Sequence, residues 1–208
     1  MKERCGLQVD TLAGQVVCTS QDIKVTRLNL ATPQSQLKAN LQMDYSAFLA
    51  HPQGEIRLDS KGRLAVDDIA MAAGEAIPAS SRNGLSGQGI NFHTYIQGNT
   101  DRLEVDTLVL HMPSVADIRA EGRGRHLLAT DSTEAQMTVD LHTMDLSCIR
   151  SALGLKDVAL PSTTLHATAR LRMGSLLHVD ALASQHHGRA RIALSANTKS
   201  MTYQTQMS

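Results

Sequence analysis

Hydrophobic and polar residues alternate along several stretches of the chain, and the clearest of these runs from Leu37 to Tyr45. Leu, Ala, Leu, Met and Tyr occupy every second position there, with Lys, Asn, Gln and Asp between them. Successive side chains of a β-strand point to opposite faces, so this pattern predicts a strand with one apolar and one polar face. Residues 165–173 alternate in the same way.

The stretch Ile23–Leu30 also alternates, but its apolar phase slips by one residue between Val25 and Leu28. Such a slip predicts a β-bulge at Thr26–Arg27. Thr32 to Ser35, which includes Pro33, is expected to form a turn. Shorter alternating runs predict further strands at 7–12, 15–19, 55–59, 63–67, 90–96, 103–112, 115–121, 137–141, 177–182, 190–196 and 203–207.

Helices are expected in only a few places. Residues 46–51 are typical of a single helical turn before a proline. Asp67 or Asp68 is expected to accept from the free amides of a short helix that ends at Ala73. A matching helix is expected at 145–153, with an apolar stripe and a glycine after its end. The glycine-bearing stretch 79–89 is expected to be a mobile loop.

Nearly the same pattern occurs three times. Each copy has an aliphatic residue, Val two positions later and Leu three positions after that, followed by a turn and a second alternating strand. The copies begin at Ile23, Leu103 and Leu177, so their spacings are 80 and 74 residues. A regular period indicates a repeat array in which one supersecondary unit stacks on the next. The Leu positions expected to be equivalent are Leu28, Leu108 and Leu182.

The repeat sets the expected domain organisation. We expect one elongated domain over residues 1–208, with a leading partial unit at 1–53, a second unit at 54–133 and a third at 134–208. Each full unit has several antiparallel strands and one short helix. Because repeat arrays normally carry distinct terminal caps, the pattern favours a fragment from inside a longer protein.

Composition narrows how such strands can pack. Hydrophobic residues make up 42% of the chain, but it has only three Tyr, two Phe and no Trp. Two sheets packed as a sandwich must fill a gap of about 10 Å. The alternative is one curved sheet rolled into a trough. Small residues recur at inward positions and favour the trough, namely Ala39, Ala120, Ala167, Ala169, Ala181, Ala183 and Ala190.

The expected fold is therefore mainly β: an elongated, curved antiparallel sheet with an open groove, built from repeats, with one or two short helices. No charge recurs on the apolar face, so a guest in the groove would be apolar, as a fatty acyl chain is. The residues expected to form the groove wall are Leu37, Leu41, Met43, Ile90, Phe92, Val105, Leu108, Ile118, Val139, Leu165, Leu171, Val179, Ile192 and Leu194.

Charge, cysteine content and apolar run length argue against a nucleic-acid-binding protein, a disulfide-bonded protein and a membrane-spanning segment. The 20 acidic and 20 basic residues give zero net charge and are spread evenly along the sequence. We therefore expect no basic patch and no nucleic-acid partner. The odd count of three cysteines gives little support to a Cys5–Cys18 disulfide, so free thiols are favoured. The longest apolar run, Ile69–Ala73, is far too short for a membrane span, and residues 1–10 have no apolar core for export.

The histidines and acids form no motif with a catalytic or metal-binding spacing. The nine histidines include no HxH or HExxH pattern, and no CxxC occurs. His186–His187 and the region of His142 are better explained as loop or solvent-facing residues than as metal sites. The pair Asp67–Asp68 is better explained by helix capping than by acid–base chemistry. We expect no enzymatic activity, no metal and no cofactor.

Several segments resemble a known family. They are LNLATPQSQLKANLQMDYSAF, GRLAVDDIAM and MDLSCIRSALGLKDVALPSTTLHATARL, within a stretch from about residue 6 to residue 207. In these loose alternating patterns the chain resembles the TamB/AsmA-like proteins of Bacteroidetes-type bacteria. The resemblance implies an interior fragment of a periplasmic protein that is anchored in the inner membrane through a segment absent from this chain. It also implies a taco-like β-sheet with a hydrophobic groove.

For function, the resemblance implies phospholipid transfer between membranes or assembly of outer-membrane proteins. The implied partners are phospholipid acyl chains and the outer-membrane assembly machinery. It supplies no site residues, because the family has none at matching positions. The alternative is a structural β-repeat of a surface adhesin or binding scaffold, with a closed core and partners at its loops.

Overall fold

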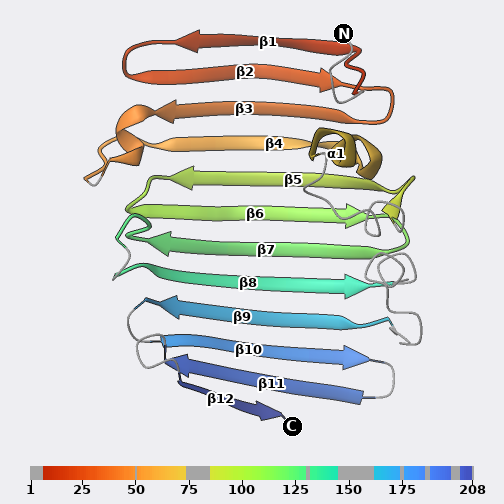
Figure 1. The fold of residues 1–208 in the computed structure, drawn as a ribbon, viewed down its shortest axis with the longest axis vertical. Helices are drawn as coiled ribbons and strands as arrows, with labels where there is room; N and C mark the ends of the chain where they lie inside the picture. Colours follow the sequence, from red (N-terminus) through yellow and green to blue (C-terminus); the bar gives the residue numbers. More distant parts are fainter. Residues whose placement is uncertain are drawn as a thin grey trace.

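The twelve strands form a single antiparallel sheet in which spatial order follows sequence order from β1 to β12. The computed structural model describes residues 7–49, 51–73, 85–129, 132–144, 162–173, 176–185, 188–197 and 202–207. Each strand is hydrogen-bonded to the strands that precede and follow it, as Figure 1 shows. The predicted fold class, an elongated curved β-sheet with little helix, is confirmed.

Most of the strands have similar lengths, so the sheet has nearly even margins (Figure 1). Between β3 and β4 lies a short 3-10 helix, η1 (Tyr45–Phe48), at the predicted helical turn; α1 (Val66–Ala73) lies between β4 and β5. The strands are β1 (Thr11–Cys18), β2 (Asp22–Ala31), β3 (Gln36–Asp44), β4 (Ile56–Ala65), β5 (Gly89–Gly98), β6 (Arg102–Met112), β7 (Ala116–Arg125), β8 (Glu134–Thr143), β9 (Thr164–Arg172), β10 (Leu176–Gln185), β11 (Gly188–Asn197) and β12 (Thr202–Met207).

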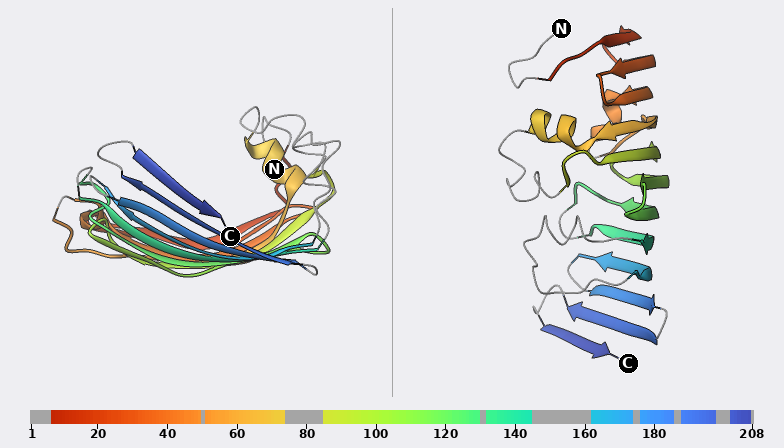
Figure 2. Two further views of the ribbon diagram at one scale, coloured as in Figure 1. Left: turned by 90° about the horizontal axis from the view of Figure 1, so that it is seen from below. Right: turned by 90° about the vertical axis from the view of Figure 1, so that its right-hand side faces the viewer.

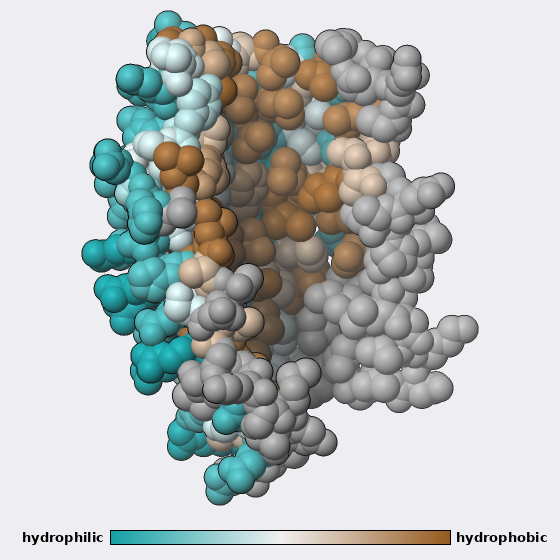
Figure 3. Space-filling model, turned by 60° about the vertical axis from the view of Figure 1, so that its left-hand side comes forward, coloured by the Kyte–Doolittle hydropathy of each residue, from teal (hydrophilic) through white to brown (hydrophobic). Residues whose placement is uncertain are grey.

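Each strand bows along its length, so the sheet forms a trough whose axis follows the stack of strands and which is seen end-on in Figure 2. Figure 3 shows that hydrophobic residues line the hollow, while hydrophilic residues gather on the outside. We call these two surfaces the apolar face and the polar face. The buried hydrophobic residues lie in η1, in α1 and at the ends and turns of strands; among the described residues they are Ala47, Ala65, Val66, Ala70, Val115 and Ala116.

Two bulges shape the first half of the sheet. In β2, Val25 pairs with Leu41 and Leu28 with Ala39, so Thr26 and Arg27 together lie opposite one residue of β3. The predicted bulge is confirmed, and Arg27 has a positive φ of 54° there. A second bulge lies in β6 between Val105 and Leu108. Bulges bend a strand and increase its local twist, which helps a sheet to curve.

The helix α1 is tied to the β2–β3 turn through a buried carboxylate. The hydroxyls of Thr32 and Ser35 each donate to Oδ2 of Asp68 at 2.5 Å. Ser35 Oγ also accepts from the backbone N–H of Ala65, at 2.9 Å, just before α1 begins. Asp68 therefore anchors α1 to the β2–β3 turn, and the prediction that it accepts from free helix amides is wrong. Its neighbour Asp67 accepts instead from the N–H of Gly87 at 3.0 Å.

Several predicted strand boundaries are wrong. The two short strands expected within 7–19 are largely one strand, β1, whose pairing with β2 is irregular near Gly14. The strands expected at 55–59 and 63–67 are also one, β4, and Val66 belongs to α1. Gly62 lies inside β4 and allows the close approach of β3, because a Cβ there would lie 2.0 Å from the carbonyl oxygen of Gln36. The helix expected at 145–153 and most of the loop at 79–89 lie outside the described residues.

The repeat recurs every four strands, so β2, β6 and β10 occupy equivalent places in the sheet. The strands β2 and β6 each carry a bulge, whereas β10 pairs without a register shift with both of its neighbours. Without the bulge, Ala181 falls on the apolar face and Leu182 on the polar face. The prediction that Leu182 is equivalent to Leu28 and Leu108 is therefore wrong, because Leu182 lies on the opposite face of the sheet. Its side chain is 41% exposed.

Candidate functional site

The apolar face runs without interruption across the sheet. Paired Cα positions in an antiparallel sheet carry side chains on the same face, so the register traces the face from strand to strand. Leu41 pairs with Leu58, Leu58 with Ile96 and Ile96 with Val105. The trace then continues from Leu108 through Ala120 and Val139 to the last strands.

All fourteen predicted wall residues lie on the apolar face by this register. The bulge in β6 makes this possible for Val105 and Leu108, because an odd spacing would otherwise place them on opposite faces. Grouped by strand, the residues are Leu37, Leu41 and Met43 (β3), Ile90 and Phe92 (β5), Val105 and Leu108 (β6), Ile118 (β7), Val139 (β8), Leu165 and Leu171 (β9), Val179 (β10), and Ile192 and Leu194 (β11).

The apolar face is only partly covered. Among the described residues, no large side chain is fully buried, and several on this face are well exposed, including Met137 at 49% and Ile192 at 42%. The helix α1 stands over one margin of the trough near β4 (Figure 2). No other described helix longer than a single turn lies over the sheet. Over the described residues, the face is therefore partly exposed apolar surface rather than the inside of a packed core.

Small side chains make the hollow in the second half of the sheet. One row of paired positions runs from Ala120 through Val139 and Ala167 to Ala181. The neighbouring row contains Gly122, where an added Cβ would come within 2.8 Å of the carbonyl oxygen of Gln136. The alanines of the first row leave space above the backbone that larger side chains would fill, whereas Gly122 marks a close approach of β7 and β8.

No charged residue of β1 to β11, within the described part of the chain, lies on the apolar face by register. Its polar side chains include Ser60 and Thr94, which pair across β4 and β5. Ser60 is buried. An apolar surface with no fixed charge offers no strong hydrogen bond to a guest, so recognition there would depend on shape and hydrophobicity.

The charges lie on the polar face, many of them in cross-strand pairs. Arg191 Nε donates to Asp180 at 3.1 Å between β11 and β10, and this hydrogen bond lowers the pKa of Asp180. His166 lies 2.6 Å from Asp140 between β9 and β8. At the β1–β2 turn, the hydrogen bond from Thr19 is the main cause that lowers the pKa of Asp22. Exposed pairs of this kind contribute little to stability, but they keep the outer surface hydrated.

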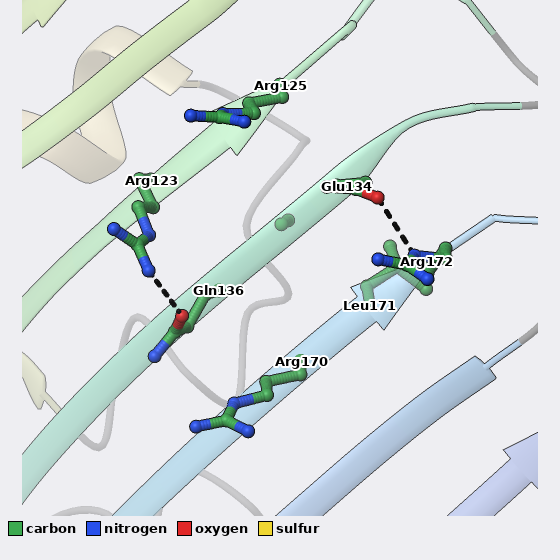
Figure 4. Close-up of a pocket in the computed structure, with 8 residues that line it drawn as sticks. Arg123, Arg125, Glu134, Gln136, Arg170, Leu171 and Arg172 are labelled. Atoms are coloured by element: carbon green, nitrogen blue, oxygen red, sulfur yellow. Dashed lines mark hydrogen bonds and ion pairs between the residues drawn. The ribbon is translucent and has the colours of Figure 1, made fainter.

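One prediction about the polar face is wrong: the sheet does assemble a basic patch. Five arginines from β6, β7 and β9 gather near one margin of the sheet, and four of them line the depression shown in Figure 4. Acidic residues lie between these arginines in the sequence, so the even distribution of charge along the chain did not indicate the patch. The signal was the pair of Arg-x-Arg motifs at the polar positions of two strands that flank β8. The five are Arg102, Arg123, Arg125, Arg170 and Arg172.

Groups for metal or redox chemistry do not gather in the described part of the chain. It contains no cluster of three His, Cys, Asp or Glu residues that could hold a metal ion. No described helix is long and apolar enough to cross a membrane. Cys18 is a free, exposed cysteine, and its Sγ lies 3.2 Å from the hydroxyl of Tyr45. This contact raises the pKa of Tyr45. Cys5, Cys148 and His186–His187 lie outside the described residues.

Comparison with known proteins adds no family to this description. No family model, curated protein or solved structure matches the chain. The resemblance to the TamB/AsmA-like proteins therefore stays a prediction, and so do the periplasmic location and the partners that it implies.

Proposed function

We propose that this chain is a non-enzymatic segment of a TamB/AsmA-like envelope protein of the periplasm, and that its trough holds phospholipid acyl chains. The role would be phospholipid transfer between membranes or support of outer-membrane assembly. One observation carries the proposal: the apolar face is continuous from β2 to β11, uncharged and incompletely covered among the described residues. Figure 3 shows this face as a hydrophobic hollow with a hydrophilic exterior.

The free energy of binding would come from removing methylene groups from water. Each buried methylene contributes about 0.8 kcal/mol, so a chain of about 15 methylenes would gain on the order of 12 kcal/mol relative to water. Association and ordering costs reduce this figure substantially. Because the wall offers similar aliphatic contacts from strand to strand, an acyl chain can move along it with small changes in free energy.

The length of the trough also fits acyl chains. Twelve strands at a spacing of about 4.8 Å extend roughly 50 Å along the stack, which exceeds the hydrocarbon thickness of a whole bilayer, about 30 Å. An acyl chain spans about half of that thickness. The trough is therefore long enough for acyl chains to lie end to end, with headgroups in water beyond its rim.

Two arginine substitutions on adjacent residues of β8 test the proposal. Val139 lies on the apolar face, and Thr138 lies on the polar face opposite Glu121. We expect purified wild-type protein to carry phospholipid, detected by native mass spectrometry and lipid extraction. Val139→Arg should lose most of this lipid, because it places a charge in the hollow, whereas Thr138→Arg should retain it.

Two outcomes would contradict the proposal. Wild-type protein that carries no lipid and takes none up from vesicles would support the alternative, a scaffold with a closed core and partners at its loops. Equal lipid loss in both variants, with unchanged circular dichroism, would show that the lipid binds elsewhere.

A further inference from the structure

The five arginines Arg102, Arg123, Arg125, Arg170 and Arg172 form a group that we call the arginine cluster. It lies on the polar face, so it is separated from the trough by the thickness of the sheet. Its positions form two rows across neighbouring strands. In the first row Arg102 pairs with Arg125, and Arg125 pairs with Glu134. The same row ends at Arg172, the partner of Glu134 on β9.

The second row places a neutral residue between two arginines. Gln136 of β8 pairs with Arg123 on one side and with Arg170 on the other. Arg123 donates to the Gln136 side-chain oxygen at 3.2 Å, as Figure 4 shows. A glutamate at this position would pair with both guanidinium groups. A glutamine gives neither guanidinium group a counter-charge from β8, although Glu104 of β6 is the paired position on the other side of Arg123.

The acidic neighbours are already engaged. Glu104 accepts from Arg102 at 2.7 Å, and Glu134 accepts from Arg172 at 2.8 Å. The hydrogen bond from Glu104 is also the main cause that raises the pKa of Arg102. The side chains of Arg125 and Arg170 make no hydrogen bond or ion pair with the described residues. The cluster therefore has five positive and two negative groups in a chain with zero net charge.

This arrangement has a cost for the sheet. Arg102 and Arg125 are paired positions, and like charges directly opposite each other on neighbouring strands are destabilising. The guanidinium groups of Arg123, Arg125 and Arg170 surround an open depression with a volume of about 440 Å³, and the amide of Gln136 adds a further donor. Unmatched donors around one depression are the arrangement that an anion would complete.

We propose that the arginine cluster binds a phosphate group, in particular a phosphate monoester. A monoester carries a charge of about −1.5 to −2 at pH 7 and three acceptor oxygens. It therefore matches three guanidinium groups that have no ion pair better than a single carboxylate does. Because the cluster is on the polar face, the proposal does not depend on acyl chains in the trough. The phosphate can belong to a lipid headgroup or to a soluble molecule.

The test uses glycerol 3-phosphate and, separately, phosphatidylcholine vesicles with and without phosphatidic acid. We expect Arg123→Gln/Arg170→Gln to weaken binding of the phosphate probe at least tenfold by calorimetry. The control Arg57→Gln/Arg119→Gln removes the same charge from the polar face of β4 and β7 and should change binding less than threefold. Gln136→Glu should also weaken binding at least tenfold, while leaving the unfolding midpoint unchanged or higher, because it gives two arginines a partner.

The outcomes separate the possible sources of phosphate. Cluster-dependent binding of glycerol 3-phosphate indicates a soluble monoester. Cluster-dependent binding of phosphatidic acid vesicles alone indicates a headgroup. The proposal is overturned if the wild type binds neither probe, or if the control variant loses as much affinity as the cluster variant.

Discussion

The two halves of the trough are built differently, although one sheet contains both. The N-terminal half, β2 to β6, has two bulges, α1 at its margin and mainly Leu, Ile, Val and Phe on its apolar face. The C-terminal half, β7 to β11, pairs without a register shift and carries Ala or Gly at many of the same positions. The comparison indicates that the first half is packed more closely and that the second leaves more room for a guest.

The largest loss of stability is expected from a substitution of Asp68, whose hydrogen bonds lie within the N-terminal half. Asp68→Ala removes the acceptor shared by the buried hydroxyls of Thr32 and Ser35. Each buried polar group left unsatisfied costs about 1–3 kcal/mol, so we expect a total loss of about 2–4 kcal/mol. Urea unfolding measures this. The neighbouring Asp67→Ala should cost less than about 1 kcal/mol, since its bond to Gly87 is exposed. Equal losses would contradict the anchoring role of Asp68.

Overpacking should distinguish the halves directly. Ala39 has Leu28 and Ser60 as its paired neighbours, whereas Ala167 has Val139 and Ala181. Ala39→Phe should destabilise the protein by about 1–3 kcal/mol, the usual cost of extra volume in a packed site. Ala167→Phe should cost less than about 1 kcal/mol and should displace lipid instead. A cost for Ala167→Phe as large as that for Ala39→Phe would show that the second half is closed as well.

The smallest change in stability is expected in β10, the strand of the repeat that has no bulge. Leu108 lies on the apolar face, and its sequence equivalent Leu182 lies on the polar face. We expect Leu108→Gln to cost about 1–2 kcal/mol through lost burial. Leu182→Gln should change stability by less than about 0.5 kcal/mol. Thermal unfolding of both variants decides this, and a reversed order would mean that the register of β10 is wrong.

Local alternation predicted much of the fold, including the strand at Leu37–Tyr45, which ends at Asp44 in the structure, the bulge at Thr26–Arg27 and the face of all fourteen wall residues. Alternation succeeds because each strand has one apolar side, which fixes its register. It failed where a long-range contact decides the structure. Gly62 lies within β4, where the backbone of Gln36 on β3 approaches it closely. Asp68 accepts a hydrogen bond from Ser35, in a turn more than thirty residues earlier.

The candidate sites differ in the same way. The apolar wall could be predicted because its members share a local pattern. The arginine cluster could not, because its members are brought together only by the order of β6, β7, β8 and β9 in the sheet. Acidic residues elsewhere in the sequence balance the positive charge of the cluster, so the zero net charge of the chain did not indicate it.

Site-specific photo-crosslinking tests the open trough most directly. Ala181 of β10 lies on the apolar face, and Ala193 of β11 lies on the polar face one strand away. A photoreactive phenylalanine analogue would replace each in turn, in protein exposed to phospholipid vesicles and then separated from them. An open trough that holds acyl chains should give lipid adducts at position 181 and none at position 193. Adducts at neither position, or equally at both, would contradict it.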